Sequence, residues 1–216
     1  MDRLVQEARL DARRRVAAGA MLARAFHNDP LANYIFPGDR RRPQALAWLF
    51  RRLLSYGERY GTLQLTPPPL RGAAIWLPSD ALSPSAGGLI RSGLVLTPLG
   101  VGIAACLRIV SQNSYSTALL AGAMPERYWY LLTLGVEPTS QHQGLASAML
   151  RPALVEADRL GIPCALGTEN EANLLFYSQY GFAVVRAGQI PGGPRVWSML
   201  RPPSSLPHTG PHTPVL

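Results

Sequence analysis

Apolar and polar positions follow two different periods along this chain, and each period predicts a different kind of element. Residues 13–26 and 44–60 carry apolar side chains three and four positions apart, which places them on one face of a helix. Short apolar runs bounded by Gly and Pro predict strands at residues 62–66, 72–77, 128–136, 164–168, 182–190 and 196–200. Further helices are expected at residues 31–36, 144–160 and 171–180. The order of these elements predicts an α/β fold, in which a mixed sheet has helices on both faces.

Three stretches give weaker patterns. Residues 79–124 are apolar but interrupted by glycines, so we expect two or three loose helices there, near residues 89–94, 99–111 and 117–120. Residues 1–12 are charged and predict a frayed arm or the start of a helix. Residues 203–216 are rich in Pro, Ser, Thr and His, which is typical of disorder. We therefore predict a single domain over residues 13–202, with a helical insertion at 79–124 and a disordered tail at 203–216.

The charge of the chain leaves two interpretations open. The net charge is +8, and all 21 basic residues are arginine. Runs of arginine at residues 13–15, 40–42 and 51–52 could bind nucleic acid or could lie on solvated helix faces. No aromatic residues interleave with them to make a nucleic-acid motif, so solvated faces are favoured and no nucleic-acid partner is expected.

No apolar run approaches the ~18 residues of a membrane span, and the N-terminus lacks the pattern of a signal peptide. These features predict a cytoplasmic protein without a membrane partner. Cys106 and Cys164 lie in apolar runs and are expected to be buried small side chains, not a disulfide or a nucleophile. His208 and His212 in the tail make a weak metal site at best, so no metal is predicted.

Residues 128–150 combine a strand, a polar loop and a helix in the order that binds phosphate groups. The apolar run ends at Glu137-Pro138, the pattern Gln141-x-x-Gly144-x-Ala146 follows, and Gly144 opens a helix. Amides at the start of a helix have no intrahelical acceptor, and the helix dipole adds partial positive charge there. Small residues let a pyrophosphate approach the main chain closely.

This loop resembles the acetyl-CoA loop of the GNAT acyltransferases, in which Arg or Gln-x-x-Gly-x-Gly or Ala follows a strand. Downstream, the run from Asn173 through Phe176-Tyr177 to Gly181-Phe182 is similar to the GNAT segment Asn-x-x-Phe-Tyr-x-x-x-Gly-Phe. The resemblance implies a GNAT fold with splayed central strands. It also implies an enzyme that transfers an acetyl group from acetyl-CoA to the amine of a small molecule.

Within the family, the likeness is greatest to the antibiotic-modifying branch that includes puromycin N-acetyltransferase. The chain shares with that branch the Ala-Phe-x-x-x-Pro element that ends at Pro30 and the Gly-Pro-Arg-x-Trp-x-Met ending at residues 193–199. The likeness covers most of residues 16–202. It implies that the acceptor is an antibiotic or a peptide-like metabolite.

The resemblance also implies roles for residues at matching positions. Tyr177 matches the family's general acid, and a phenol suits this task because it stays protonated at neutral pH. Asn173 matches the residue that contacts the pantetheine arm, and the acceptor is expected near Phe26, Asp29 and Tyr34. The cofactor-binding set is expected to comprise Leu134, Gly135, Val136, Gln141, His142, Gln143, Gly144, Leu145, Ala146, Ser147, Asn173 and Tyr177. Without the resemblance, Tyr177 would be a core aromatic and Asp29 an N-cap.

Two departures from the family pattern bear on function. His142 stands where a glycine is usual, and Gly167 stands where the branch often has the glutamate of Leu-Glu-Thr. A carboxylate that could act as the base is therefore missing, and Glu169 is the candidate substitute. Asp29, a water chain or an already neutral amine are the alternatives. The chain could also be a CoA-binding sensor or scaffold that transfers nothing, and it could be a monomer or a homodimer.

Overall fold

One sheet runs through the molecule. A computed structural model describes residues 6–7, 10–38, 40–120 and 122–204, and within them the strands form one seven-stranded sheet in the order β1-β2-β3-β4-β5-β7-β6. β4 and β5 pair in parallel, and the other neighbouring strands pair antiparallel. The strands are β1 (Gln6–Glu7), β2 (Thr62–Leu65), β3 (Gly72–Pro78), β4 (Trp129–Val136), β5 (Cys164–Thr168), β6 (Ala183–Gln189) and β7 (Arg195–Arg201). The predicted mixed sheet and its two hairpins, β2–β3 and β6–β7, are confirmed.

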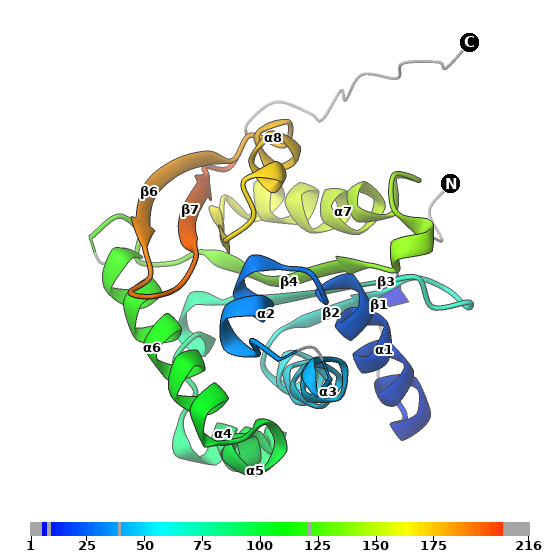
Figure 1. The fold of residues 1–216 in the computed structure, drawn as a ribbon. Helices are drawn as coiled ribbons and strands as arrows, with labels where there is room; N and C mark the ends of the chain where they lie inside the picture. The colour runs from blue at the N-terminus through cyan, green and yellow to red at the C-terminus, as the bar shows by residue number, and fades with distance from the viewer. Residues whose placement is uncertain (1–5, 8–9, 39, 121, 205–216) are drawn as a thin grey trace.

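Helices cover both faces of the sheet, as predicted (Figure 1). One face carries α1 (Ala12–Ala25), α2 (Pro30–Ile35) and α3 (Arg42–Tyr60). The other carries α7 (Leu145–Leu160) and α8 (Ala172–Ser178). The segment between β3 and β4 forms α4 (Ala86–Ser92), α5 (Thr97–Val101) and α6 (Ile103–Leu120), with single 3-10 turns at Ser79–Ala81 (η1) and Leu94–Leu96 (η2).

β3 is buried on both faces because it lies between two helical layers. Ala73, Ile75 and Leu77 join the cluster beneath α1 and α3, whereas Ala74 and Trp76 join the cluster beneath α7. Successive side chains of a strand point to opposite faces, so one strand supplies both cores.

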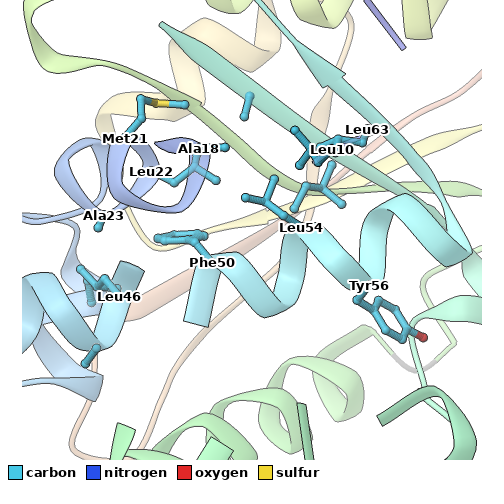
Figure 2. Packing of buried hydrophobic residues seen from close by; sticks show 14 of the residues in the cluster. Leu10, Ala18, Met21, Leu22, Ala23, Leu46, Phe50, Leu54, Tyr56 and Leu63 are labelled. Carbon is cyan, nitrogen blue, oxygen red and sulfur yellow. The ribbon is translucent and has the colours of Figure 1, made fainter. Parts of the chain in front are cut away.

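The first core lies between α1, α3 and β2, where Figure 2 shows apolar side chains of the two helices directed toward one another. Leu22 of α1 and Leu54 of α3 are completely buried, and Phe26 packs its ring 5.1 Å from that of Phe50. Burying one such side chain stabilises the fold by roughly 1.5–3 kcal/mol. This core fixes the end of α1, and with it the position of the turn that leads into α2.

β4 and β5 separate partway along their length. They are paired from Trp129–Cys164 to Leu131–Leu166, and no pairing between them follows, although β4 continues to Val136. The side of β4 that faces β5 is therefore open over its last five residues, while its other side stays paired with β3. The predicted splaying of the two central strands is confirmed, and it leaves main-chain groups of β4 without a strand partner.

Two expectations about the helices and strands were wrong. Residues 103–120 form one continuous helix, α6, whereas the sequence predicted two helices separated at residues 112–116. The polar run 111–116 interrupts the apolar pattern without interrupting the helix. The chain before α1 contains the short strand β1, which pairs with β2, in place of the predicted arm or helix start. A strand of two residues, such as β1, is too short to show an alternating pattern in the sequence. Most of the predicted disordered tail, residues 205–216, lies outside the described residues.

The C-terminal end of the sheet is tied to α7 by a buried ion pair, and we expect its loss to destabilise the fold strongly. Both guanidinium Nη atoms of Arg201 lie 2.7 Å from the two carboxylate oxygens of Asp158, and the Ser204 amide donates to the same carboxylate. Asp158→Ala would leave the Arg201 charge buried without its counter-ion, which costs about 3–5 kcal/mol. Urea denaturation measures this loss. Glu156→Ala, which removes an exposed ion pair to Arg159 on the same helix, is the control and should change the midpoint little. Equal shifts in the two variants would contradict the expectation.

Candidate functional site

The predicted phosphate loop begins at a residue held by an ion pair. Arg24, at the end of α1, donates from Nε and Nη2 to the Glu137 carboxylate at 2.9 and 2.6 Å. This hydrogen-bonded pair lowers the pKa of Glu137. The Glu137 amide in turn donates to the Arg71 carbonyl at 2.7 Å. The start of the loop is therefore fixed to both α1 and the β2–β3 hairpin.

The loop itself turns back on β4 through its own side chains. The side-chain amide of Gln141 donates to the Val136 carbonyl at 3.2 Å, after the 3-10 turn Pro138–Ser140 (η3). His142 has a φ of 60° and Gly144 a φ of 75°, so both lie in the left-handed region. A non-glycine residue there costs roughly 1–2 kcal/mol. His142 thus occupies, at some cost, a conformation that glycine adopts freely, which explains why glycine is usual at this position in the family pattern.

Amides at the start of α7 point away from the helix without acceptors. The Ala148 amide donates to the Gly144 carbonyl, which closes the first turn. Among the described residues, no acceptor is assigned to the amides of residues 142–147. Gly144 to Ser147 are also half-buried or exposed, so these donors are accessible. Such a row of free amides at a helix N-terminus suits a phosphate group.

The end of β4 lies beside this row of amides. Gly135 packs so closely on α1 that a Cβ there would lie 2.5 Å from Leu22 and 2.9 Å from Phe26. Only glycine fits between the strand and the helix. Leu134 packs against the cluster beneath α7. The open side of this strand faces the gap between β4 and β5.

α8 closes the gap from the side of α7. The Tyr180 hydroxyl donates to the Ser147 hydroxyl at 2.6 Å, and the Asn173 side-chain amide donates to Thr168 Oγ1 at 3.1 Å. The first bond joins the turn that follows α8 to the first turn of α7, and the second joins α8 to the end of β5. The predicted loop residues, Asn173 and Tyr177 therefore belong to one connected unit.

Tyr177 is buried within that unit. It is 8% exposed and packs edge-on against Phe176 and Phe182, with ring centroids 5.2 and 5.9 Å away. Burial raises the pKa of its hydroxyl, and the Asp29 carboxylate raises it further. Because Tyr177 comes from α8 and Asp29 from the N-terminus of α2, their interaction spans the gap where β4 and β5 separate. A phenol in this setting is a proton donor throughout the neutral pH range.

Two carboxylates, Glu169 and Asp29, interact electrostatically near this gap. The pKa of the Glu169 carboxyl is raised to about 7, chiefly because the group is buried and next because the Asp29 carboxylate lies nearby. A hydrogen bond with the Gln112 side chain of α6 opposes this rise. Asp29 caps α2, accepting from the Leu31 amide at 2.9 Å, and burial raises its pKa as well. The N-cap interpretation of Asp29 is therefore confirmed, and the same carboxylate adds negative charge near Glu169 and Tyr177.

Tyr130 is the residue that the sequence did not point to. Its hydroxyl lies 2.8 Å from the place where a Cβ on Gly167 would be, and the Gly167 amide hydrogen-bonds to it. Burial raises its pKa, and the charge of Glu169 is the next largest cause. Tyr130 pairs with Ala165 across β4 and β5, so Gly167 lies two residues along on the same face. The departure at residue 167 is thus accommodated by a phenol that fills the vacated space and lies beside Glu169.

The other residues expected near the acceptor lie at different depths. Phe26 caps α1 and packs on Phe50, so its ring belongs largely to the core. Tyr34 of α2 is half-buried and lies against the β6–β7 turn, 3.1 Å from where a Cβ on Gly193 would be. The gap is therefore bordered by α2, α6 and the end of β5.

Other chemistries find little support in the described part of the chain. Its His, Cys, Asp and Glu residues form no group of three or more that could hold a metal ion, and His208 and His212 lie outside it. Both cysteines are free, and burial raises the pKa of Cys164 to about 12, so its thiol is unreactive. Within the described residues, no helix has the length and hydropathy needed to cross a bilayer.

Comparison with known proteins supports the family resemblance found in the sequence. Residues 91–182, which contain β4, the loop, α7 and α8, match the Acetyltransferase (GNAT) family. The part of the chain that carries the candidate site is thus similar in sequence to the GNAT acetyltransferases. This similarity supports an acyl-CoA-dependent N-acyltransferase, and the mixed α/β fold expected from the loop and the Asn173–Tyr177 segment is confirmed.

Solved structures with the same fold include other acetyltransferases. A histone acetyltransferase HPA2-related acetyltransferase of Corynebacterium glutamicum superposes with a TM-score of 0.62 at 21% identity, over 96% of this chain and 99% of that one. Arylalkylamine N-acetyltransferase 2 of Aedes aegypti gives 0.61 at 10% identity, over 93% and 99%. An agmatine N-acetyltransferase gives 0.61 at 14% identity, over the same shares of the two chains. At these identities the likeness establishes the shared fold.

Proposed function

We propose that this protein transfers an acetyl group from acetyl-CoA to the amine of a small molecule, an antibiotic or a peptide-like metabolite. The observation that carries the proposal is the meeting of three features at one gap. These features are the free amides at the start of α7, the buried Tyr177 hydroxyl, and the Glu169 and Asp29 carboxylates, with Asp29 acting on both Glu169 and Tyr177. The proposal treats residues 13–202 as one catalytic domain, and its cytoplasmic location remains a prediction.

The cofactor half of the proposal rests on the loop. The amides of residues 142–147 would bind the pyrophosphate, and the open side of β4 at residues 134–136 would face the pantetheine arm. The Asn173 side-chain oxygen accepts no hydrogen bond among the described residues while its NH₂ group is held by Thr168, so the oxygen is free to accept from a pantetheine amide. Bound acetyl-CoA would supply an activated acetyl group.

The transfer needs one proton removed and one added. Glu169, once ionised, would take the proton of the attacking amine, and Tyr177 would give its proton to the departing sulfur. The C–N bond forms as the C–S bond breaks, and the proton held by Glu169 is returned through solvent to the Tyr177 oxygen. Tyr130 interacts with both groups in this account, because the charge of Glu169 and the hydroxyl of Tyr177 both raise its pKa.

The proposed acceptor, an amine, is argued from the negative charge of two carboxylates. Asp29 and Glu169 each raise the pKa of the groups around them, as neighbouring partly buried carboxylates do. An amine that arrives as a cation relieves this repulsion and loses its first proton to solvent by way of Asp29. Glu169 is then free to accept the second proton as the C–N bond forms. Arylalkylamines and agmatine, the substrates named for two proteins of the same fold, are amines of this kind, and they enter the proposal as compounds to test.

We expect the amide row to be decisive for cofactor binding, and two glycines of α7 allow a matched test. Gly144 and Gly161 cap opposite ends of the helix with φ of 75° and 66°, and a Cβ at either would meet nothing within 4 Å. Alanine at either position costs roughly 1–2 kcal/mol of stability because of the left-handed backbone. Gly144→Ala should also weaken acetyl-CoA binding by about tenfold or more, since relieving the strain turns the amides away. Calorimetry on both variants checks this.

Gly161→Ala should bind acetyl-CoA as the natural chain does. Equal affinity in both variants would remove the loop from the cofactor site. Thiol release is then measured with arylalkylamines, agmatine and puromycin as acceptors. Binding of acetyl-CoA without release of the CoA thiol on any amine would favour the alternative, a CoA-binding sensor. The observation that motivates this alternative is the missing carboxylate at Gly167.

A further inference from the structure

α6 has an apolar face that no other described element covers. Ile103, Leu107 and Val110 are 72%, 64% and 55% exposed, and their spacing of four and three residues places them on one side of the helix. Leu99 of α5, just before this helix, is 85% exposed. The stripe therefore continues from α5 along the first half of α6, on the outer side of the molecule.

The opposite face of α6 faces inward and is already engaged. Ala105 is buried, Arg108 donates to the Ile35 carbonyl at 3.3 Å, and the Tyr115 hydroxyl lies against Gly188 of β6. Figure 1 shows the helix running beside β6 and β7 toward α4 and α5. The exposed stripe is thus not the face by which α6 packs on its own domain.

The stripe lies in a region almost without charge. Between residues 92 and 125 the sequence contains one ionisable Asp, Glu, Lys, Arg or His side chain, Arg108, and that side chain is bonded to Ile35 on the inner face. The chain as a whole has a net charge of +8. Two copies therefore repel one another over most of their surface. This face is one on which they can meet without bringing like charges together.

We propose that the α5–α6 stripe, Leu99, Ile103, Leu107 and Val110, is the surface on which two copies of this chain form a symmetric dimer. A twofold axis places the same patch on both subunits, so a charge-free apolar stripe is self-complementary. Depletion of charge at the centre is the composition expected of such interfaces. The site proposed for acetyl transfer does not enter the argument, and the dimer stands or falls separately.

The number of exposed apolar positions agrees with this partner. A specific interface involves about 20–30 residues on each side and about 800 Å² per partner. Apolar side chains are also exposed at Ile90 of α4 and at Val95 and Leu96 of η2, so exposed apolar positions recur from Ile90 to Val110, with the exposed Arg91 at the edge of this segment. A contiguous apolar surface of more than a few hundred Å² is rare on a monomer.

A membrane surface fits less well. Helices that lie on membranes carry Lys and Arg along the polar face beside Trp or Phe on the apolar one. The polar positions of α6 are instead Ser111, Asn113, Ser114 and Thr117, and its single arginine is held against Ile35. Nothing on this helix would attract an anionic lipid.

The test is sedimentation equilibrium of the full chain over about 1–100 µM, with Leu107→Glu as the variant. The natural chain should be dimeric at about 20 µM, and Leu107→Glu should raise the dimer Kd by about 100-fold or more, because the axis brings two carboxylates to one apolar site. Val155→Glu on α7, where the original side chain is 51% exposed, is the matched control and should stay dimeric.

Far-UV circular dichroism confirms that each variant is folded, and Leu107→Ser serves as a milder second variant, expected to weaken the dimer less. A natural chain that is monomeric at about 100 µM would overturn the proposal. So would a Leu107→Glu protein that dimerises as tightly as the natural one. If the chain is monomeric and cosediments with phosphatidylcholine vesicles, the stripe binds a lipid surface and not a second copy of the chain.

Discussion

Replacing Tyr177 with Phe should lower kcat by about 100-fold or more while leaving the Kd for acetyl-CoA within about twofold. The ring packs edge-on against Phe176 and Phe182, and Phe preserves these contacts. Only the hydroxyl is lost, and its raised pKa keeps it protonated over the range in which the enzyme would work. An interaction made only as the sulfur departs lowers kcat and kcat/KM together without changing binding.

Steady-state kinetics and calorimetry together measure these two quantities. Tyr60→Phe is the control, because Tyr60 is another phenol whose hydroxyl is buried, here without a hydrogen-bond partner in the described structure. It lies in α3 among the N-terminal core residues. Its removal should leave kcat unchanged. If Tyr177→Phe reduced cofactor affinity and turnover by the same factor, Tyr177 would be a binding residue and not the acid.

Replacing Glu169 with Gln should slow transfer by about 100-fold at pH 8 and abolish the rise of kcat/KM through about pH 7. The pKa of Glu169 is raised to about 7, so the carboxylate that can accept a proton accumulates only as the pH passes that value. Burial is the main cause of this raised pKa, the Asp29 carboxylate of α2 raises it further, and a hydrogen bond with Gln112 of α6 opposes the rise. Tyr130 of β4 also faces Glu169, and the charge of Glu169 raises the pKa of that tyrosine. A profile of kcat/KM against pH measures the pH at which this rise occurs.

The pH dependence of stability that Glu169 causes has the opposite sign to its effect on activity. The folded-state pKa of Glu169 lies above its ordinary value of 4.5, so its contribution to stability is fully present below pH 4.5 and is lost as the pH rises through about 7. Glu169→Gln should therefore increase stability at pH 8 while it decreases activity. Glu171→Gln, at an exposed position two residues along, should change neither. A profile for the natural enzyme that is flat from about pH 6 to 8 would remove Glu169 as the base.

The opposed effects on stability and activity would separate a catalytic carboxylate from a structural one. Replacing a carboxylate that stabilises the fold lowers the free energy of unfolding. Replacing a carboxylate whose pKa is raised to about 7 by burial increases the free energy of unfolding, because the buried charge itself destabilises the fold. The Asp158–Arg201 pair shows the contrast within this molecule. It is also buried, but its charges are mutually satisfied at 2.7 Å, and its loss should cost stability.

Local features of the site could be predicted because each depends on neighbours in the chain. A strand that ends at Glu137-Pro138, a turn with Gly144 and an apolar helix after it are sufficient to place free amides at one point. The two hairpins followed from alternation and turn residues in the same way. The continuous α6 was missed because a solvated helical stretch such as residues 111–116 carries no apolar period to detect.

The surroundings of the missing carboxylate could not be predicted, because they depend on register between distant strands. Gly167 alone suggests an empty position. Only the parallel pairing of Tyr130 with Ala165 reveals that a hydroxyl from β4 fills the space two residues along. The signal in the sequence was a tyrosine in an otherwise apolar strand, and its significance depends on which residue lies opposite.

The sequence by itself determined the local structure of the proposed cofactor site, since the loop, Asn173 and Tyr177 lie within about forty residues and their geometry follows from one strand–loop–helix unit and the helix after it. The tertiary structure alone decided the surroundings of the proposed acceptor site. It brought Asp29 from α2, Gln112 from α6, Tyr130 from β4 and Glu169 from the end of β5 to one gap, and the pKa of Glu169 exists only in that assembly. The physical reason is that burial and charge act through space, and the distance between these groups is set by the packing of α1 and α3 and by the separation of β4 from β5.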